Sequence, residues 1–467
     1  MTDIETKETE TLYKIVNQIN DRINGTVNAG QMSTYAIEEQ VIKIDRTNGV
    51  RITTEPQVVY KIFASPKIVE TIMTEILSFI KDNYQKNGLL TKFNDNQIHM
   101  FVRHFAYSIA NKSVNNKKID EKEINEKLNL FIDEVEDNPV SNLVKIELKG
   151  VDLNDAESIE WECDNKKITI RKISEEDIRT WWAGGRYQSS QTVFSMPETI
   201  MEIRSKIKPS EADFNTLGWS AWRGITILKL FSLGDVFATN ISISRDTVAD
   251  FGGQVGLPQI GKAYYPVSKY SIGTQNKQKL EGFWNYLNKI LPDIFYNKIK
   301  NADWSSSAIA YDRYSEALSI TEPVKRIAYA IMGLESIYLV GDAELNFRLS
   351  MNTAKTMSLF IGGDAVLIKK AVNLSYSLRS MFVHGAVHSE SYDKLMAKIK
   401  VDFGSVEALS KLLLEYLRLS ILIMINVGQD NKYDFIDKIS GLMIVDDTKI
   451  KDELNSKYFA KLKDYVI

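Results

Sequence analysis

The sequence predicts a multidomain α+β protein with a helical N-terminal region, a β-rich middle domain and an all-α bundle in the C-terminal half. Apolar residues recur at helical spacing on both sides of a middle stretch in which alternating, β-branched runs predominate. With 467 residues the chain is also too long for one compact core. We therefore expect a mainly helical region at 1–137, a β-rich domain at 138–277 and an all-α domain at 278–467.

The composition indicates a folded protein of balanced charge. Of its residues 44% are hydrophobic and 25% are charged, and only 9 are proline, so no bulk disorder is predicted. A net charge of −3 and a pI near 6.0 exclude a strongly basic protein of the histone kind. A local basic surface that binds nucleic acid is still compatible with this nearly balanced net charge.

Neither a membrane span nor a metal site is predicted. The first residues, MTDIETKETETLY, carry acids and no apolar stretch, unlike a secretory signal. The most apolar run, 414–428, is interrupted by Glu415 and Arg418 and is too short to span a bilayer, so we expect a buried helix there. A single cysteine, Cys163, and four histidines without paired spacing favour neither a disulfide nor a zinc site. We expect a cytoplasmic protein without a cofactor and without a membrane partner.

Local periodicity predicts the elements of the first two regions. Helical spacing runs from 66 to 135, whereas VRITTEP at 50–56 fits a short strand or a loop. Four strands are expected in the middle domain, at 143–151, 166–173, 224–231 and 236–243. Five of the seven tryptophans fall in this domain, where they either pack the β core or form an aromatic surface for bases or peptides.

The C-terminal domain has the pattern of an all-α bundle, with about seven helices joined by short loops. Thr321 is the expected N-cap of a helix that begins with Glu322 and Pro323, and Asp364 can begin another. The helices are expected at 279–297, 306–319, 321–339, 343–360, 364–385, 405–426 and in a final pair before the C-terminus.

The helix expected at 364–385 has apolar residues on two sides. Around Leu378, its core face carries Ala371, Leu374, Met381 and Phe382. The opposite face carries Tyr376, Arg379, Ser380 and His384 in one patch, together with Val372 and Val383. Such a helix needs a second partner, either another helix of the same chain or a second copy of the protein. Gly385 suits the left-handed position that ends a helix, which places His384 in the last turn.

Two side chains of this patch suit metal-free RNA cleavage. The guanidinium of Arg379 is a permanently charged fork that matches phosphate oxygens. The carbonyl end of a helix favours a protonated imidazole, so His384 is suited to moving protons to or from the 2′-hydroxyl or the leaving oxygen. Because an Arg five residues before a His arises readily by chance, the position at a helix end and the surrounding residues carry the argument.

The stretch YSLRSMFVHG contains Arg379 and His384 as Arg-x4-His and resembles the signature of the HEPN superfamily. Its LRSxxVHG pattern is most similar to the Apea-like HEPN branch. RIAYAIMGLESIYL and ELNFRLSMNTAKTM are also similar to that branch, so the resemblance covers about 278–430. It implies an HEPN-like bundle that forms a homodimer in which two Arg–His pairs face one cleft. Such a protein is a metal-independent endoribonuclease, and many relatives are toxins or antiviral defence effectors. Cellular RNA such as tRNA is the substrate it implies.

The resemblance also implies roles for the patch on this helix. His384 would be the acid and base, Arg379 would bind the scissile phosphate, and Tyr376 and Ser380 would orient it. The family often has Asn, Asp or His directly after the Arg, where this chain has Ser380.

Two further residues have open roles. Glu335 stands where the family's upstream helix carries an acid that can reach the active centre, or it is a buried ion-pair partner of Arg348 or Arg379. His388 either contributes to the cleft or is an exposed loop histidine.

Other classes of function compete with the nuclease. An inactive HEPN-like bundle would be a dimerisation or scaffold module of a sensor protein. A DNA-binding regulator would need a basic recognition helix or a helix-turn-helix, and neither is evident. If the chain is a nuclease, we expect residues 1–275 to sense a phage or cellular trigger and to restrain the toxic activity.

Overall fold

The structure, a computed structural model, describes most of the chain beyond residue 136. Side chains are described at 137–178, 197–211, 215–245, 271–293, 295, 305–341, 344–386 and 389–466. The strands at 32–45, 51–64 and 253–254 and residue 270 are described by backbone alone, and between 70 and 134 only short groups of residues are described. Those groups are all helical, as the spacing at 66–135 predicts.

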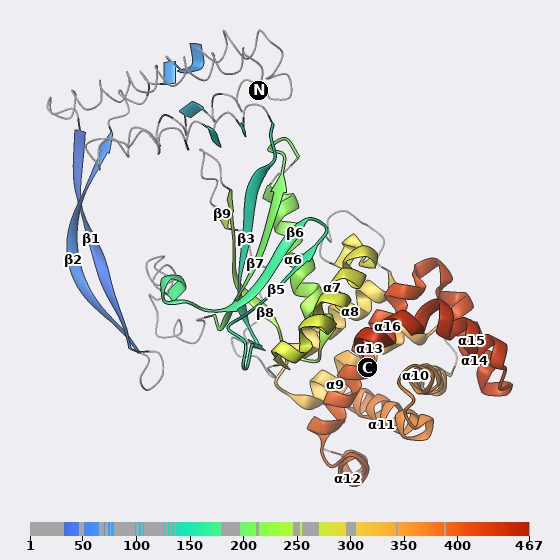
Figure 1. The fold of residues 1–467 in the computed structure, drawn as a ribbon. Helices are drawn as coiled ribbons and strands as arrows, with labels where there is room; N and C mark the ends of the chain where they lie inside the picture. The colour runs from blue at the N-terminus through green and yellow to red at the C-terminus, as the bar shows by residue number, and fades with distance from the viewer. Residues whose placement is uncertain are drawn as a thin grey trace.

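A two-stranded antiparallel ribbon lies in the N-terminal region. It consists of β1 (Met32–Asp45) and β2 (Arg51–Ala64), and it is set apart from the main sheet in Figure 1. The choice between strand and loop left open at 50–56 is therefore a strand at 51–56, and the expectation of a helical N-terminal region does not hold for 32–45 and 51–64. The β-branched residues of RITTEPQVVYKIFA explain the preference for an extended backbone.

The middle of the chain forms a six-stranded antiparallel sheet in the order β5-β6-β7-β3-β8-β9. Its strands are β3 (Val140–Lys149), β5 (Ser158–Cys163), β6 (Lys166–Lys172), β7 (Thr199–Ile207), β8 (Phe237–Arg245) and β9 (Gly253–Gln254). Two short parallel strands, β4 (Val151–Asp152) and β10 (Tyr270–Ser271), form a separate two-stranded sheet. The β5–β6 hairpin turns at Asp164 and Asn165, whose φ angles of 48° and 60° are those of a two-residue hairpin turn.

Three of the four strands expected here are confirmed, and the fourth is wrong. The runs at 143–151, 166–173 and 236–243 lie in β3 with β4, in β6 and in β8. The run at 224–231 instead ends α6 (Phe214–Phe231), a helix packed against β3 and β8. The sequence expectation also lacked β5 and β7.

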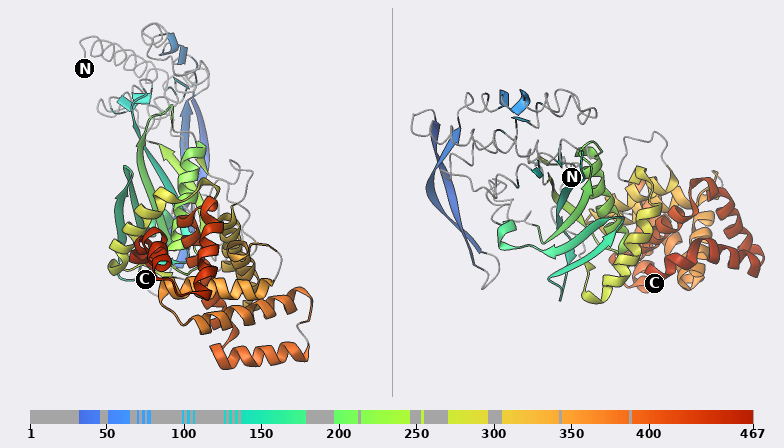
Figure 2. Two further views of the ribbon diagram at one scale, coloured as in Figure 1. Left: turned by 90° about the vertical axis from the view of Figure 1, so that its right-hand side faces the viewer. Right: turned by 45° about the horizontal axis from the view of Figure 1, so that its top comes forward.

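The C-terminal part is helical, as expected. Its helices are α7 (Lys277–Ile290), α8 (Ser306–Leu318), α9 (Pro323–Tyr338), α10 (Leu345–Ile361), α11 (Ala365–Val383), α12 (Glu390–Phe403), α13 (Val406–Val427), α14 (Lys432–Ile444), α15 (Thr448–Leu454) and α16 (Ala460–Val466). The sequence expectation lacked α12, which lies at the lower edge of the helical part in Figure 1 and in the left view of Figure 2. The N-cap of α9 is Glu322 and not Thr321, whose carbonyl accepts a hydrogen bond from Arg326.

One apolar core joins the sheet to the helices. The buried residues form a continuous cluster from Val144 on β3 to Leu462 on α16, which runs across the boundary expected at 277. Where α7 meets β5, Trp161 and Trp284 pack edge to face with ring centroids 5.2 Å apart. The apolar run at 414–428 forms most of α13, which is buried as expected. No helix among the described residues is long and apolar enough to cross a membrane.

Candidate active site

Both ends of α11 are fixed by local hydrogen bonds. At the N-terminus the side chain of Asp364 accepts bonds from two backbone N–H groups of the first turn, as predicted. At the C-terminus Gly385 has a φ of +71° and its N–H donates to Phe382, while the N–H of Ala386 donates to Met381 at 2.8 Å. This Schellman arrangement makes His384 the C-cap, and the predicted place of His384 at the helix end is confirmed.

The two faces of α11 differ in what covers them. On the core face, Ala371 and Leu378 are fully buried, as predicted. On the opposite face Val372 is also fully buried, whereas Val383 is 56% exposed. Because α9 and α10 both pack against α11, the chain itself supplies a second partner for most of the helix. The C-terminal end, with Val383 and His384, faces outward.

Arg379 is brought together with Glu335 of the neighbouring helix α9. Its Nη2 lies 3.7 Å from Glu335 Oε2, and the two side chains are 26% and 20% exposed. Of the two ion-pair partners considered for Glu335, the structure thus selects Arg379. Burial raises the pKa of the Glu335 carboxyl, and the positive charge of Arg379 opposes this rise without cancelling it.

The guanidinium of Arg379 is unusual because it makes no hydrogen bond to any residue that the structure describes. The separation of 3.7 Å from Glu335 is too long for one, and its Nε is buried without an acceptor. Two buried arginines of the bundle behave differently: Arg326 binds two carbonyls and Glu407, and Arg418 binds two carbonyls and Glu415. Since buried donors are nearly always paired, the unpaired Nε of Arg379 marks this guanidinium as a group that a ligand can bind.

The other expected site residues lie around this arginine with fewer contacts. Tyr376 is half-buried against the core and Ser380 is half-buried one turn further on. His384 is exposed, and its side chain forms no hydrogen bond or ion pair with Arg379 or Glu335. His388 lies outside the described residues. The site within one copy is therefore an Arg–Glu pair beside an exposed histidine.

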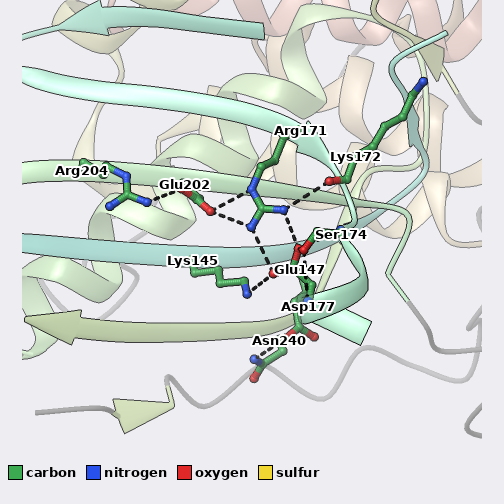
Figure 3. A network of polar contacts seen from close by, with 9 residues as sticks. All are labelled: Lys145, Glu147, Arg171, Lys172, Ser174, Asp177, Glu202, Arg204 and Asn240. Carbon is green, nitrogen blue, oxygen red and sulfur yellow. Dashed lines mark hydrogen bonds and ion pairs between the residues drawn. The ribbon is translucent and has the colours of Figure 1, made fainter. Parts of the chain in front are cut away.

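A second polar cluster, missed by the sequence reasoning, lies on the face of the sheet opposite α6 (Figure 3). Arg171 on β6 bonds both Asp177 and Glu202, and Lys145 on β3 donates to Asp177 at 2.5 Å. Burial raises the pKa of Asp177, but hydrogen bonds from Arg171, Lys145 and Ser174 outweigh it and hold this pKa well below its usual range. Because the charges satisfy one another, this cluster acts as a structural tie between strands. The polar residues at alternate positions of β6, Lys167, Thr169 and Arg171, were a sequence signal for it.

The histidines and tryptophans outside α11 add no site in the described part of the chain. His99 occupies a helical position, and His104 lies outside the described residues. Of the five tryptophans of the middle domain, Trp161 is buried in the core and Trp222 packs against it, Trp219 is partly exposed, and Trp181 and Trp182 lie outside the described residues. No group of three or more His, Cys, Asp or Glu side chains among the described residues is placed to hold a metal ion.

Comparison with known proteins gives no further guide: no family model, no curated protein and no solved structure matches the chain.

Proposed function

We propose that the chain is a metal-independent endoribonuclease of the HEPN type that cleaves cellular RNA as a homodimer. The observation that carries this proposal is the guanidinium of Arg379, three-quarters buried yet without a hydrogen bond to any described residue. A planar, permanently charged group with unused donors suits the non-bridging oxygens of a phosphate. The nearby end of α11 exposes an imidazole, which supplies a group for proton transfer.

The proposed reaction needs only these groups and the RNA itself. A neutral imidazole of His384 accepts the proton of the 2′-hydroxyl while the 2′-oxygen attacks the adjacent phosphorus. The bond from phosphorus to the 5′-oxygen breaks, and the second imidazole of the dimer, in its protonated form, gives a proton to that oxygen. Arg379 stabilises the charge that builds on the phosphate. The products are a 2′,3′-cyclic phosphate and a 5′-hydroxyl.

The dimer is proposed to form at the outward-facing end of α11. Val383, 56% exposed directly before His384, would be covered there by its counterpart in the second copy. The N-terminal region is proposed to restrain the activity until a phage or cellular trigger is sensed.

The test is cleavage of total cellular RNA by the full-length protein in the presence of EDTA. We expect wild type to cut, and His384→Ala and Arg379→Ala each to lose about 100-fold or more in rate. Arg313→Ala, which removes an arginine paired with Glu316 on α8, is the control and should cut normally. An oligonucleotide with 2′-deoxyribose at every position should stay intact.

Cleavage by His384→Ala at the wild-type rate would refute the assignment. A dimer that leaves RNA intact under every condition would favour the scaffold function instead.

A further inference from the structure

A buried lysine and a serine hydroxyl meet on the side of the bundle formed by α8, α9 and α14. Nζ of Lys432 lies 2.8 Å from Oγ of Ser306 and 2.8 Å from the carbonyl oxygen of Ser336. Lys432 is only 7% exposed, whereas Ser306 is partly exposed at the first position of α8. The three residues are far apart in the sequence, so the pair is a product of the fold.

The lysine has no counter-charge. No carboxylate of a described residue pairs with Lys432, and burial lowers the pKa of its ammonium group. Lys438, two turns further along α14, shows the opposite situation: it pairs with Asp434 and Glu453, and hydrogen bonds to them raise its pKa. A desolvated lysine without a carboxylate is suited to be neutral and to accept a proton.

The backbone of Ser306 is fixed by two hydrogen bonds, and the next N–H along the chain has no acceptor among the described residues. The N–H of Ser306 donates to Gln429 Oε1 at 3.0 Å, and its carbonyl accepts from Ser336 Oγ at 3.1 Å. In the same first turn the N–H of Ala308 is taken by Ser305 Oγ. The N–H of Ser307 has no acceptor among the described residues, and it belongs to the residue that directly follows Ser306.

We propose that Ser306 and Lys432 form a nucleophile and general-base pair that accepts an acyl group from a carboxylic ester or amide, with the N–H of Ser307 stabilising the oxyanion. Neutral Lys432 takes the hydroxyl proton while Oγ of Ser306 bonds to the carbonyl carbon. The bond to the leaving oxygen or nitrogen then breaks, and the lysine ammonium returns the proton to it. Water hydrolyses the resulting acyl-serine by the reverse sequence of proton transfers. This site is independent of the proposed ribonuclease.

The experiment treats the full-length protein with an alkyl fluorophosphonate, in which the serine oxygen bonds to phosphorus and fluoride leaves. Intact mass spectrometry with peptide mapping should find one adduct, on Ser306, and Ser306→Ala should remove it. The labelling rate should rise with pH and level off with a midpoint below the ordinary lysine value of about 10.4, because only the neutral amine is a base.

The Lys432→Arg variant distinguishes a catalytic role of Lys432 from a role in packing alone. Arginine keeps a donor for the Ser336 carbonyl but stays protonated, so labelling should slow about 100-fold while the melting temperature stays close to wild type. Ser358→Ala, which alters a partly buried serine of α10 that bonds only the carbonyl of Lys355, should label as wild type does. Arg379→Ala should also label normally.

Two results would overturn the proposal. One is the absence of an adduct on Ser306 at any pH at which the protein is folded. The other is equal labelling of wild type and Lys432→Arg, which would show that the lysine only fastens α14 to α8 and α9.

Discussion

At the scale of single residues, the ionised carboxylate of Glu335 is a liability to the folded protein. Burial raises its pKa above the unfolded value even though Arg379 opposes this rise. For a carboxyl group with a raised folded-state pKa, the penalty is absent below the unfolded pKa and is felt as pH rises through the folded pKa. We expect Glu335→Gln to raise the free energy of unfolding at pH 7.5 by less than about 1 kcal/mol and to change nothing at pH 4.

Melting curves of both proteins at the two pH values test this expectation. Glu316→Gln, an exposed acid of α8, is the control and should show no such pH-dependent gain. A lower melting temperature of Glu335→Gln at pH 7.5 would mean that attraction to Arg379 exceeds the cost of burial.

The same scale shows which parts of the candidate site the sequence could specify. Spacing and residue type predicted Asp364 and Gly385 at the ends of α11, because capping depends on residues within one turn. Spacing could not choose between two partners for Glu335, since that depends on how α9 lies against α11. The contact of Ser306 with Lys432, separated by 126 positions, carried no local signal at all.

At the scale of elements, the error at α6 has a physical cause. Ile225, Ile227, Leu228 and Leu230 are all buried, because α6 is covered by the sheet on one side and by helices on the other. A helix buried all round shows no polar stripe, and a run with two isoleucines and a threonine then resembles a buried strand. By contrast, α7 keeps an exposed polar side and was predicted as a helix, although it ends at Ile290 and not at 297.

Two helical glycines offer a matched test of how closely the elements pack. A Cβ atom added at Gly333 of α9 would lie 2.8 Å from both Cδ atoms of Leu417 on α13, whereas one added at Gly441 of α14 would meet nothing within 4 Å. We expect Gly333→Ala to destabilise the protein by about 1–3 kcal/mol through overpacking. Gly441→Ala should stabilise it by up to about 1 kcal/mol through helix propensity.

Urea unfolding of the two variants measures these opposite changes. If Gly333→Ala were as stable as wild type, α9 and α13 would be able to move apart without loss of stability. The close contact between them would then not be needed for the stability of the bundle.

At the scale of the whole molecule, the sheet and the bundle are fastened at the end of α6. The carbonyls of Leu230 and Phe231, in the last turn of that helix, accept hydrogen bonds from Arg418 of α13 at 2.6 and 3.0 Å. Tyr314 of α8 donates to the carbonyl of Lys229 in the same turn at 3.1 Å. Helix ends need such donors because their last carbonyls have no partner within the helix. With the continuous apolar core, these bonds predict that both parts unfold together.

Arg418→Met tests that coupling, because methionine fills much of the same space without a donor. The change leaves two buried carbonyls of α6 without their partner and frees Glu415 from its ion pair, so we expect a loss of about 3 kcal/mol. Urea unfolding should be followed by tryptophan fluorescence, to which Trp161 and Trp284 at the contact of β5 with α7 contribute, and by helical circular dichroism. Both signals should shift together to lower urea, while Lys394→Met, at an exposed pair on α12, should change stability by less than about 0.5 kcal/mol. Separate transitions in the wild-type protein would show instead that the sheet and the bundle unfold independently. The hydrogen bonds at the end of α6 would then not couple them.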